Sequence, residues 1–202
     1  MSDYKVIAEV GETLANVLWL EIQSDPDLFA LINSASLISL ESPAEHQNNN
    51  DTALLSIYLY RITEDPFMKN QYAGQGSGGK TKRAPMALDL NYLITPLLKA
   101  PRDQQIVLGK IMQVLYDRPS LEGADMAGTT LGTTGEKLRV LFNPASLDDI
   151  ARVWDALETA YRLSICYTVR VSMLDSKQEQ AQQRVVGSQF GYGQGNVPVP
   201  PV

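Results

Sequence analysis

The chain has 202 residues, a net charge of −6, one cysteine and one histidine. This length fits one domain that buries about 70% of the surface its unfolded chain would expose. A lone Cys166 cannot form an intrachain disulfide. One cysteine and one histidine in the whole sequence also leave a structural zinc site without its usual ligands. The scattered basic residues of an acidic chain also argue against nucleic acid as a partner, so we expect no metal, cofactor or nucleic acid.

The N-terminal segment is predicted to form an amphipathic helix. Apolar residues recur at helical spacing between Asp3 and Ile22, and Asp25-Pro26 supplies a stop. The segment has neither the regions of a signal peptide nor the apolar length of a membrane span. We therefore expect a cytoplasmic protein that does not insert directly into a membrane.

The next segment predicts a short strand over Leu37–Leu40 and a longer strand over Ala53–Thr63. The polar run at positions 48–51 between them indicates a turn, and hence a hairpin. Tyr58 and Tyr60 lie on the reverse face of the second strand, either under a helix or exposed at an interface. Arg61 is either an interface ion-pair donor or a local partner of the acidic residues at 64 and 65.

Residues 74–81 match the P-loop pattern, ending in Lys80 and Thr81. A phosphate cradle needs a buried strand directly before it and a helix directly after it. Here polar residues precede the pattern and Pro85 follows it, so a solvated loop is the favoured interpretation. The basic residues Lys80, Lys82 and Arg83 lead to the hypothesis that this loop contacts an acidic patch on a neighbouring subunit or on the sheath.

The second half of the chain alternates between strands and helices. Strict alternation of apolar residues predicts strands over Met86–Ile94 and Tyr161–Val171, each with one face on a core and the other half wet. A helix is expected from Pro101, with Asp103 as its N-cap, to the Arg118-Pro119 stop, and a loop over 120–136. A strand over Leu138–Phe142 should follow.

A further helix should begin at Ser146 in a capping-box-like start, which accounts for Asp148 and Asp149 without a catalytic role. Its apolar stripe comprises Leu147, Ile150, Trp154 and Leu157. Trp154 is interpreted as a core residue. Cys166 falls on the polar side of its strand and is interpreted as a small packing residue.

Together these elements predict an α+β fold, with one domain built on a mixed, mostly antiparallel sheet flanked by helices. This domain covers residues 1–175. From residue 176 the sequence turns to Gln, Gly and Pro, which predicts an extended or disordered tail over 176–202. Tyr192 in this tail is a candidate interface residue.

Four blocks of sequence carry a family resemblance. They lie at Ile57–Arg61, Ala87–Thr95, Leu108–Pro119 and Ser146–Val169. In this order they resemble the tail-terminator, or cap, proteins of extracellular contractile injection systems, which are phage-tail-like particles. The resemblance covers roughly residues 1–175 and lies in the ordered set rather than in any one block.

This resemblance implies a structural protein and no enzyme. It implies a homo-oligomeric, six-fold ring that contacts sheath and inner-tube proteins and ends their polymerisation at the baseplate-distal end. Part of the tail is hypothesised to add as a strand to the sheath or to an adjacent cap subunit. The alternatives are another structural tail component, such as a tube-end or adaptor protein, and a P-loop nucleotide-binding protein.

Overall fold

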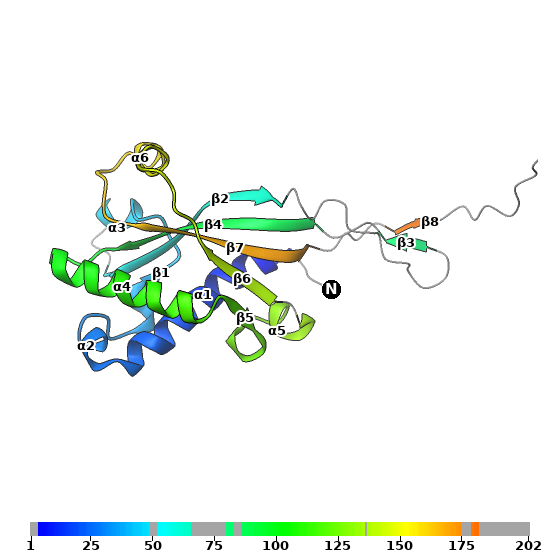
Figure 1. Cartoon of the computed structure of the whole chain (residues 1–202), viewed down its shortest axis with the longest axis horizontal. Helices are drawn as coiled ribbons and strands as arrows, with labels where there is room; N and C mark the ends of the chain where they lie inside the picture. The colour runs from blue at the N-terminus through cyan, green and yellow to red at the C-terminus, as the bar shows by residue number, and fades with distance from the viewer. Residues whose placement is uncertain are drawn as a thin grey trace, which may run out of the picture.

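The computed structural model describes residues 4–48, 52–65, 80–82, 86–135, 137–174 and 179–181. Its centre is a six-stranded sheet in the order β1-β2-β4-β7-β6-β5 (Figure 1). The strands are β1 Ile38–Ser39, β2 Leu55–Glu64, β4 Met86–Pro96, β5 Ser120–Glu122, β6 Lys137–Phe142 and β7 Ile165–Leu174. Only the β1–β2 pair is parallel. The predicted α+β fold with a mixed, mostly antiparallel sheet is therefore confirmed.

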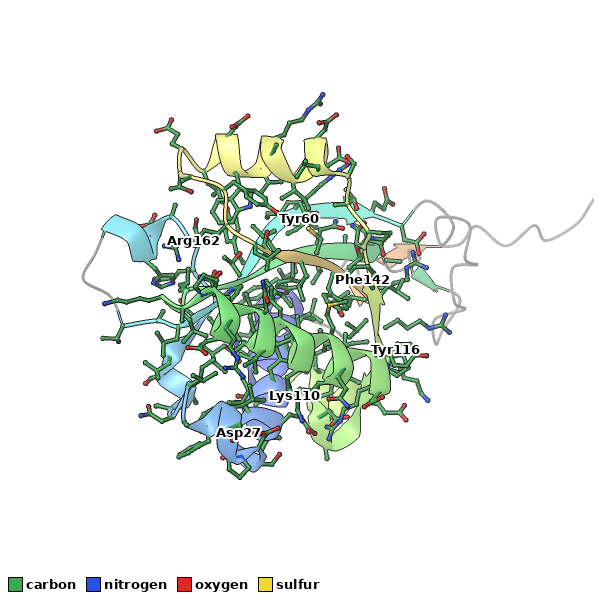
Figure 2. All side chains as sticks on the ribbon, turned by 60° about the vertical axis from the view of Figure 1, so that its left-hand side comes forward. Asp27, Tyr60, Lys110, Tyr116, Phe142 and Arg162 are labelled. Carbon is green, nitrogen blue, oxygen red and sulfur yellow. The ribbon has the colours of Figure 1, made fainter. Side chains whose placement is uncertain are left out.

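Helices cover both faces of this sheet. α1 (Val6–Ser24) and α4 (Pro101–Asp117) lie on one face, and α6 (Leu147–Ala156) lies on the other (Figures 1 and 2). The shorter helical turns are α2 Pro26–Phe29, η1 Ala35–Leu37, α3 Glu45–Asn48, η2 Gly123–Asp125 and α5 Leu131–Thr134. The sequence placed all three long helices correctly within a few residues.

The main core lies between the sheet and the pair α1 and α4. In β4 the alternating residues Leu88, Leu90, Tyr92 and Ile94 all join this core. The apolar stripe of α1 and the corresponding stripe of α4 close over them. The expected helical cover of the sheet is confirmed.

The opposite face of the sheet carries a second, smaller core. Leu93, Trp154 and Cys166 are buried there, and Tyr60 packs against them. The expectation that this face is half wet is therefore wrong at the α6 end, because the helix seals it. Tyr60 lies under a helix, which was one of the two interpretations of this residue. Cys166 is a packing residue, as predicted.

Strand β7 begins later than its alternation predicted. The structure starts the strand at Ile165, whereas Tyr161 lies before it and is half exposed. The ring of Tyr161 contacts that of Trp154 edge-on, with centroids 6.1 Å apart. The alternation therefore continued into a connecting segment whose aromatic residue packs on α6 instead of on the sheet.

The predicted hairpin between β1 and β2 is wrong. These strands pair in parallel, with Ile38 opposite Leu55 and Ser39 opposite Ser56. A parallel pair needs a crossover, and the connection of residues 40–54 contains α3. The polar run that suggested a tight turn therefore belongs to this longer connection.

The local signals at the helix ends were partly correct. Ser146 caps α6, because its hydroxyl accepts the backbone N–H of Asp149 and also bonds that side chain. Leu147 lies off the expected stripe and is 70% exposed. The N-cap of α4 is Ala100 rather than Asp103, and the expected loop over 120–136 contains β5, η2 and α5.

A second, two-stranded sheet forms from segments far apart in sequence. β3 (Lys80–Lys82) pairs antiparallel with β8 (Glu179–Ala181), and we call this pair the arm. It lies beyond the ends of β4 and β7, away from α4 and α6 (Figure 1). Three residues of the predicted tail therefore form a strand on the segment predicted as a loop.

A buried carboxylate joins α1 to the segment before α5. Glu9 accepts the backbone N–H of Leu131 at 2.8 Å and that of Thr130 at 3.1 Å. Gly128 adopts a positive φ of 84° against this side chain, where an added Cβ would collide with the carboxyl group. Burial raises the pKa of the Glu9 carboxyl, but these backbone hydrogen bonds outweigh it, and the pKa lies below its usual value.

The substitution Glu9→Gln should lower the free energy of unfolding by about 1.5–3 kcal/mol at pH 7, because charge-assisted hydrogen bonds are lost. The folded pKa is lowered, so the carboxylate contributes its full stability above the ordinary pKa and loses it as pH falls through the lower folded value. The difference in unfolding free energy between the parent and the variant, measured by urea unfolding, should thus become smaller below about pH 4. Glu12→Gln, exposed on the same helix, is the control; an equal loss there would contradict the role of Glu9.

Candidate interaction surfaces

The structure does not bring the predicted interface residues together. Arg61 is exposed on β2 in the main sheet, whereas Lys80 and Lys82 lie in β3 of the arm. Arg83 and Tyr192 lie outside the described residues. Arg61 and the arm are therefore separate candidate surfaces, and the roles of all five residues stay predictions.

The P-loop pattern has the wrong local structure where it is described. Lys80 and Thr81 are strand residues that pair with β8, with Thr81 opposite Gln180. In a P-loop these two residues begin a helix that follows the phosphate cradle. Residues 74–79 lie outside the described part of the chain. The strand assignment favours the interpretation that the pattern is a chance match.

A polar pocket of about 550 Å³ opens between Arg61 and α6. Arg61, Arg152, Asp149 and Tyr60 line it. Burial, and then the neighbouring Cys166, raise the pKa of Tyr60 to about 12. Burial likewise raises the pKa of the Cys166 thiol. These shifts reduce the ionised, nucleophilic form of both groups at neutral pH.

One of the two acidic residues expected beside Arg61 pairs with another arginine. Asp65 forms an ion pair with Arg170, at 3.0 Å between Oδ2 and Nε. Asp89 pairs with the same Nε at 2.9 Å. We call these three residues the Arg170 cluster: Asp65 directly follows β2, Asp89 lies on β4 and Arg170 lies on β7, close to the strand ends that lead to the arm. No local sequence pattern predicted this cluster, because its members are 24 to 105 residues apart.

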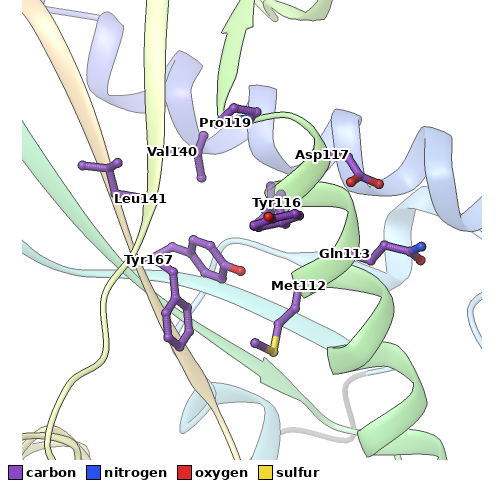
Figure 3. A pocket seen from close by; sticks show the side chains of 10 residues that line it. Met112, Gln113, Tyr116, Asp117, Pro119, Val140, Leu141 and Tyr167 are labelled. Atoms are coloured by element: carbon purple, nitrogen blue, oxygen red, sulfur yellow. The ribbon is translucent and has the colours of Figure 1, made fainter.

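An apolar groove of about 1030 Å³ lies between the C-terminal half of α4 and the end of β6. Figure 3 shows Met112 and Tyr116 on α4 opposite Tyr167 of β7. Phe142 stands edge-on to Tyr167, with ring centroids 5.5 Å apart. Tyr116 is 84% exposed and Phe142 is 51% exposed, and Figure 2 shows both on the same side of the molecule.

The groove forms where α4 and β6 end side by side and no other described element covers the apolar residues near their C-terminal ends. Met112 and Tyr116 are one turn apart on the flank of α4, next to its buried stripe. β5 pairs with β6 only as far as Arg139, so Phe142 extends beyond the covered part of the strand. We call this the aromatic groove. The i, i+4 spacing of Met112 and Tyr116 was a signal that the sequence analysis did not use.

Two further features concern other kinds of site. Within the described ranges, no group of three or more histidine, cysteine, aspartate or glutamate residues is placed to hold a metal ion. Among the same residues, no helix combines the length and apolar character needed to cross a membrane. The exposed aromatic side chains of the aromatic groove are a separate feature, typical of surfaces that contact other proteins.

Comparison with known proteins identifies the family of this chain and a solved structure with a similar fold. A family model described as the Pvc16 N-terminal domain matches residues 9–188. None of the curated proteins matches this sequence. The chain is similar to the PVC sheath/tube terminator in extended state of an extracellular contractile injection system, with 18% identity and a TM-score of 0.60, over 98% of this chain and 67% of that one. A second match is the anti-feeding prophage cap (AFP tube terminating cap), with 25% identity and a TM-score of 0.44, over 67% of this chain and 48% of that one.

Proposed function

The chain belongs to the family of the Pvc16 N-terminal domain, and from this we propose that it is a structural terminator of a contractile injection system. In this role it ends the growth of the inner tube and sheath at the baseplate-distal end of the particle. The observation that carries the proposal is the family match over residues 9–188. The fold shared with a sheath/tube terminator agrees with it, and the family resemblance inferred from the four sequence blocks is confirmed.

The physical task of such a protein is to bind one face of a polymer without offering a new one. A tube that grows by head-to-tail addition of identical layers always exposes an unsatisfied face. A differently shaped ring that covers this face stops the addition. We propose a homo-oligomeric ring, with six copies as its stoichiometry, that is assembled in the cytoplasm and contacts tube and sheath proteins without enzymatic activity.

The surfaces described above are suited to different contacts in this arrangement. The aromatic groove offers apolar area, the pocket beside Arg61 offers two guanidinium groups, and β3 of the arm carries Lys80 and Lys82. Acidic neighbours would complement the last two. We propose that the arm contacts an adjacent subunit or the sheath.

Particles produced without this chain should have sheaths and tubes of irregular or excessive length, because no ring ends their growth. Supplying the chain in trans should restore a single length, measured by electron microscopy of purified particles. A labelled copy should appear at the baseplate-distal end. Label at the baseplate end, or particles of unchanged length without the chain, would contradict the proposal.

The same assay tests the arm. Reversing the charges of Lys80, Lys82 and Arg83 should reduce the fraction of particles with a restored length. The matched control reverses Lys5, Lys99 and Arg102, which are exposed on the body of the protein. Since both variants change the net charge equally, an equal loss in the control would assign the effect to overall charge and contradict a role for the arm.

A further inference from the structure

We propose that the aromatic groove of one copy binds the proline-rich C-terminal segment, residues 197–202, of a neighbouring copy. This inference rests on the ring of the proposed function and adds the contact that joins its subunits. It follows from three features: the chemistry of the groove, the sequence of the segment, and the position of the arm from which the segment departs.

The groove has the composition that binds an extended proline-rich chain. Aromatic side chains line it, namely Tyr116, Phe142 and Tyr167, together with Met112. Polyproline II segments dock into grooves of this kind because their proline rings pack against the aromatic side chains. The segment is already extended before it binds, so it loses little conformational entropy. A polyproline II backbone makes no internal hydrogen bonds, so its carbonyl groups need donors. The hydroxyls of Tyr116 and Tyr167 in the groove are such donors.

The chain contains one segment that matches this requirement. Residues 197–202 read Val-Pro-Val-Pro-Pro-Val. Pro198 and Pro201 are three residues apart, and polyproline II has three residues per turn, so both would present the same face. Val199 and Val202 share the next face in the same way. This is the PxxP arrangement that aromatic-lined grooves recognise.

The position of the arm favours a neighbouring copy over the same chain. Tyr167, in the groove, lies near the start of β7, whereas the arm follows the end of that strand. β8 ends at Ala181, beyond the ends of β4 and β7 and away from α4 (Figure 1). The segment therefore leaves from beyond the end of β7, whereas its own groove lies beside the start of that strand. The residues between 181 and 197 can span roughly 50 Å when extended, which is enough to reach another subunit.

A contact of this kind closes a ring without a self-complementary patch. Each copy offers one groove and donates one segment, so the interface is heterologous and repeats from subunit to subunit. No edge remains when the last segment enters the first groove. The groove would then be covered in the assembly, which accounts for large aromatic side chains exposed in a single copy.

The test joins two full-length chains through engineered cysteines. One chain carries Tyr116→Cys and the other Val199→Cys, and the two are mixed under mild oxidation. The native Cys166 is buried and does not compete. We expect a disulfide between the two different chains, detected by non-reducing mass spectrometry. Tyr116 is 84% exposed, so its replacement leaves the core intact.

The control replaces Leu147, which is 70% exposed on α6, by cysteine in place of Tyr116. The Tyr116→Cys and Val199→Cys chains should give a disulfide yield roughly tenfold above this control, which corresponds to a modest binding free energy. A synthetic peptide of residues 196–202 should reduce the yield, and the same peptide with Pro198→Ala and Pro201→Ala should not. A yield no higher than that of the Leu147 control overturns the inference.

Two other outcomes also decide the question. A disulfide that forms only within one chain carrying both cysteines would assign the segment to its own groove and overturn the neighbour-copy contact. Absence of any disulfide while the chain still restores particle length would overturn the inference and leave the proposed function standing. A specific disulfide from a chain that does not restore particle length would support the contact and contradict the terminator role.

Discussion

Replacing Trp154 with alanine should lower the free energy of unfolding by about 3–5 kcal/mol. Trp154 is 2% exposed and fills the small core between α6 and the sheet. Its indole Nε1 donates to the hydroxyl of Ser164 at 3.4 Å, and its ring contacts that of Tyr161. Removal leaves a cavity that few neighbours can fill, because this cluster has only two other fully buried members, Leu93 and Cys166.

The measurement is guanidinium unfolding followed by far-ultraviolet circular dichroism, since the substitution removes one of the two tryptophans that fluorescence would report. The control is Leu147→Ala, at an exposed position of the same helix, with an expected change within about 0.5 kcal/mol. Cys166, the chain's one cysteine, should react faster with a thiol reagent in the Trp154 variant, because α6 no longer shields it. A loss below about 1 kcal/mol with unchanged thiol reactivity would show that α6 does not depend on this contact.

The strongest parts of the fold could be predicted because they depend on local periodicity. Strand β4 joins the core through its alternating residues, and α4 covers them with a stripe at helical spacing. The cap at Ser146 is a contact between residues three apart. In each case the signal and the structure involve neighbours in sequence, so tertiary packing reinforces what the pattern indicates.

The errors arose where distant segments decide the outcome. The hairpin prediction for β1 and β2 failed because a two-residue strand carries little information on its direction, and the connection that contains α3 returns the chain parallel to β1. The second face of β7 was expected to be wet because polar residues such as Thr168 and Arg170 lie on it, yet α6 covers its start. Whether a face is buried depends on which helix returns to it, and alternation within the strand does not record that.

The candidate surfaces show the same limit more strongly. Basic charge drew attention to Lys80 and Lys82, but it could not show that these residues lie in an arm, separate from Arg61. The aromatic groove combines residues of α4, β6 and β7 that are about 25 to 55 positions apart. Its members look like ordinary core residues in sequence, and the early end of β5 leaves Phe142 uncovered. A surface built in this way becomes visible only once the fold is known.

Replacing Arg170 with methionine should lower the free energy of unfolding by about 3–5 kcal/mol, because it breaks a buried ion pair by removing one member. The Asp65 side chain is fully buried and pairs with Arg170 Nε at 3.0 Å. Asp89 accepts from the same nitrogen at 2.9 Å and from a terminal guanidinium nitrogen at 3.4 Å. The hydrogen bond to Asp89, aided by the charge of Asp65, raises the pKa of Arg170, so the guanidinium stays charged throughout the accessible pH range.

The control is Arg139→Met, because Arg139 lies opposite Arg170 on β6, is exposed, and has the same volume and charge to lose. Its effect should stay within about 0.5 kcal/mol. Adding Asp65→Asn to the Arg170 variant should recover part of the loss, since the buried negative charge is then removed, and this non-additivity identifies the ion pair as the cause. Both are read from urea unfolding at one protein concentration, because assembly would shift the apparent stability. Equal losses of unfolding free energy in the Arg170 and Arg139 variants would contradict a stabilising role for the Arg170 cluster. The backbone pairing of β2, β4 and β7 would then hold these strand ends without it.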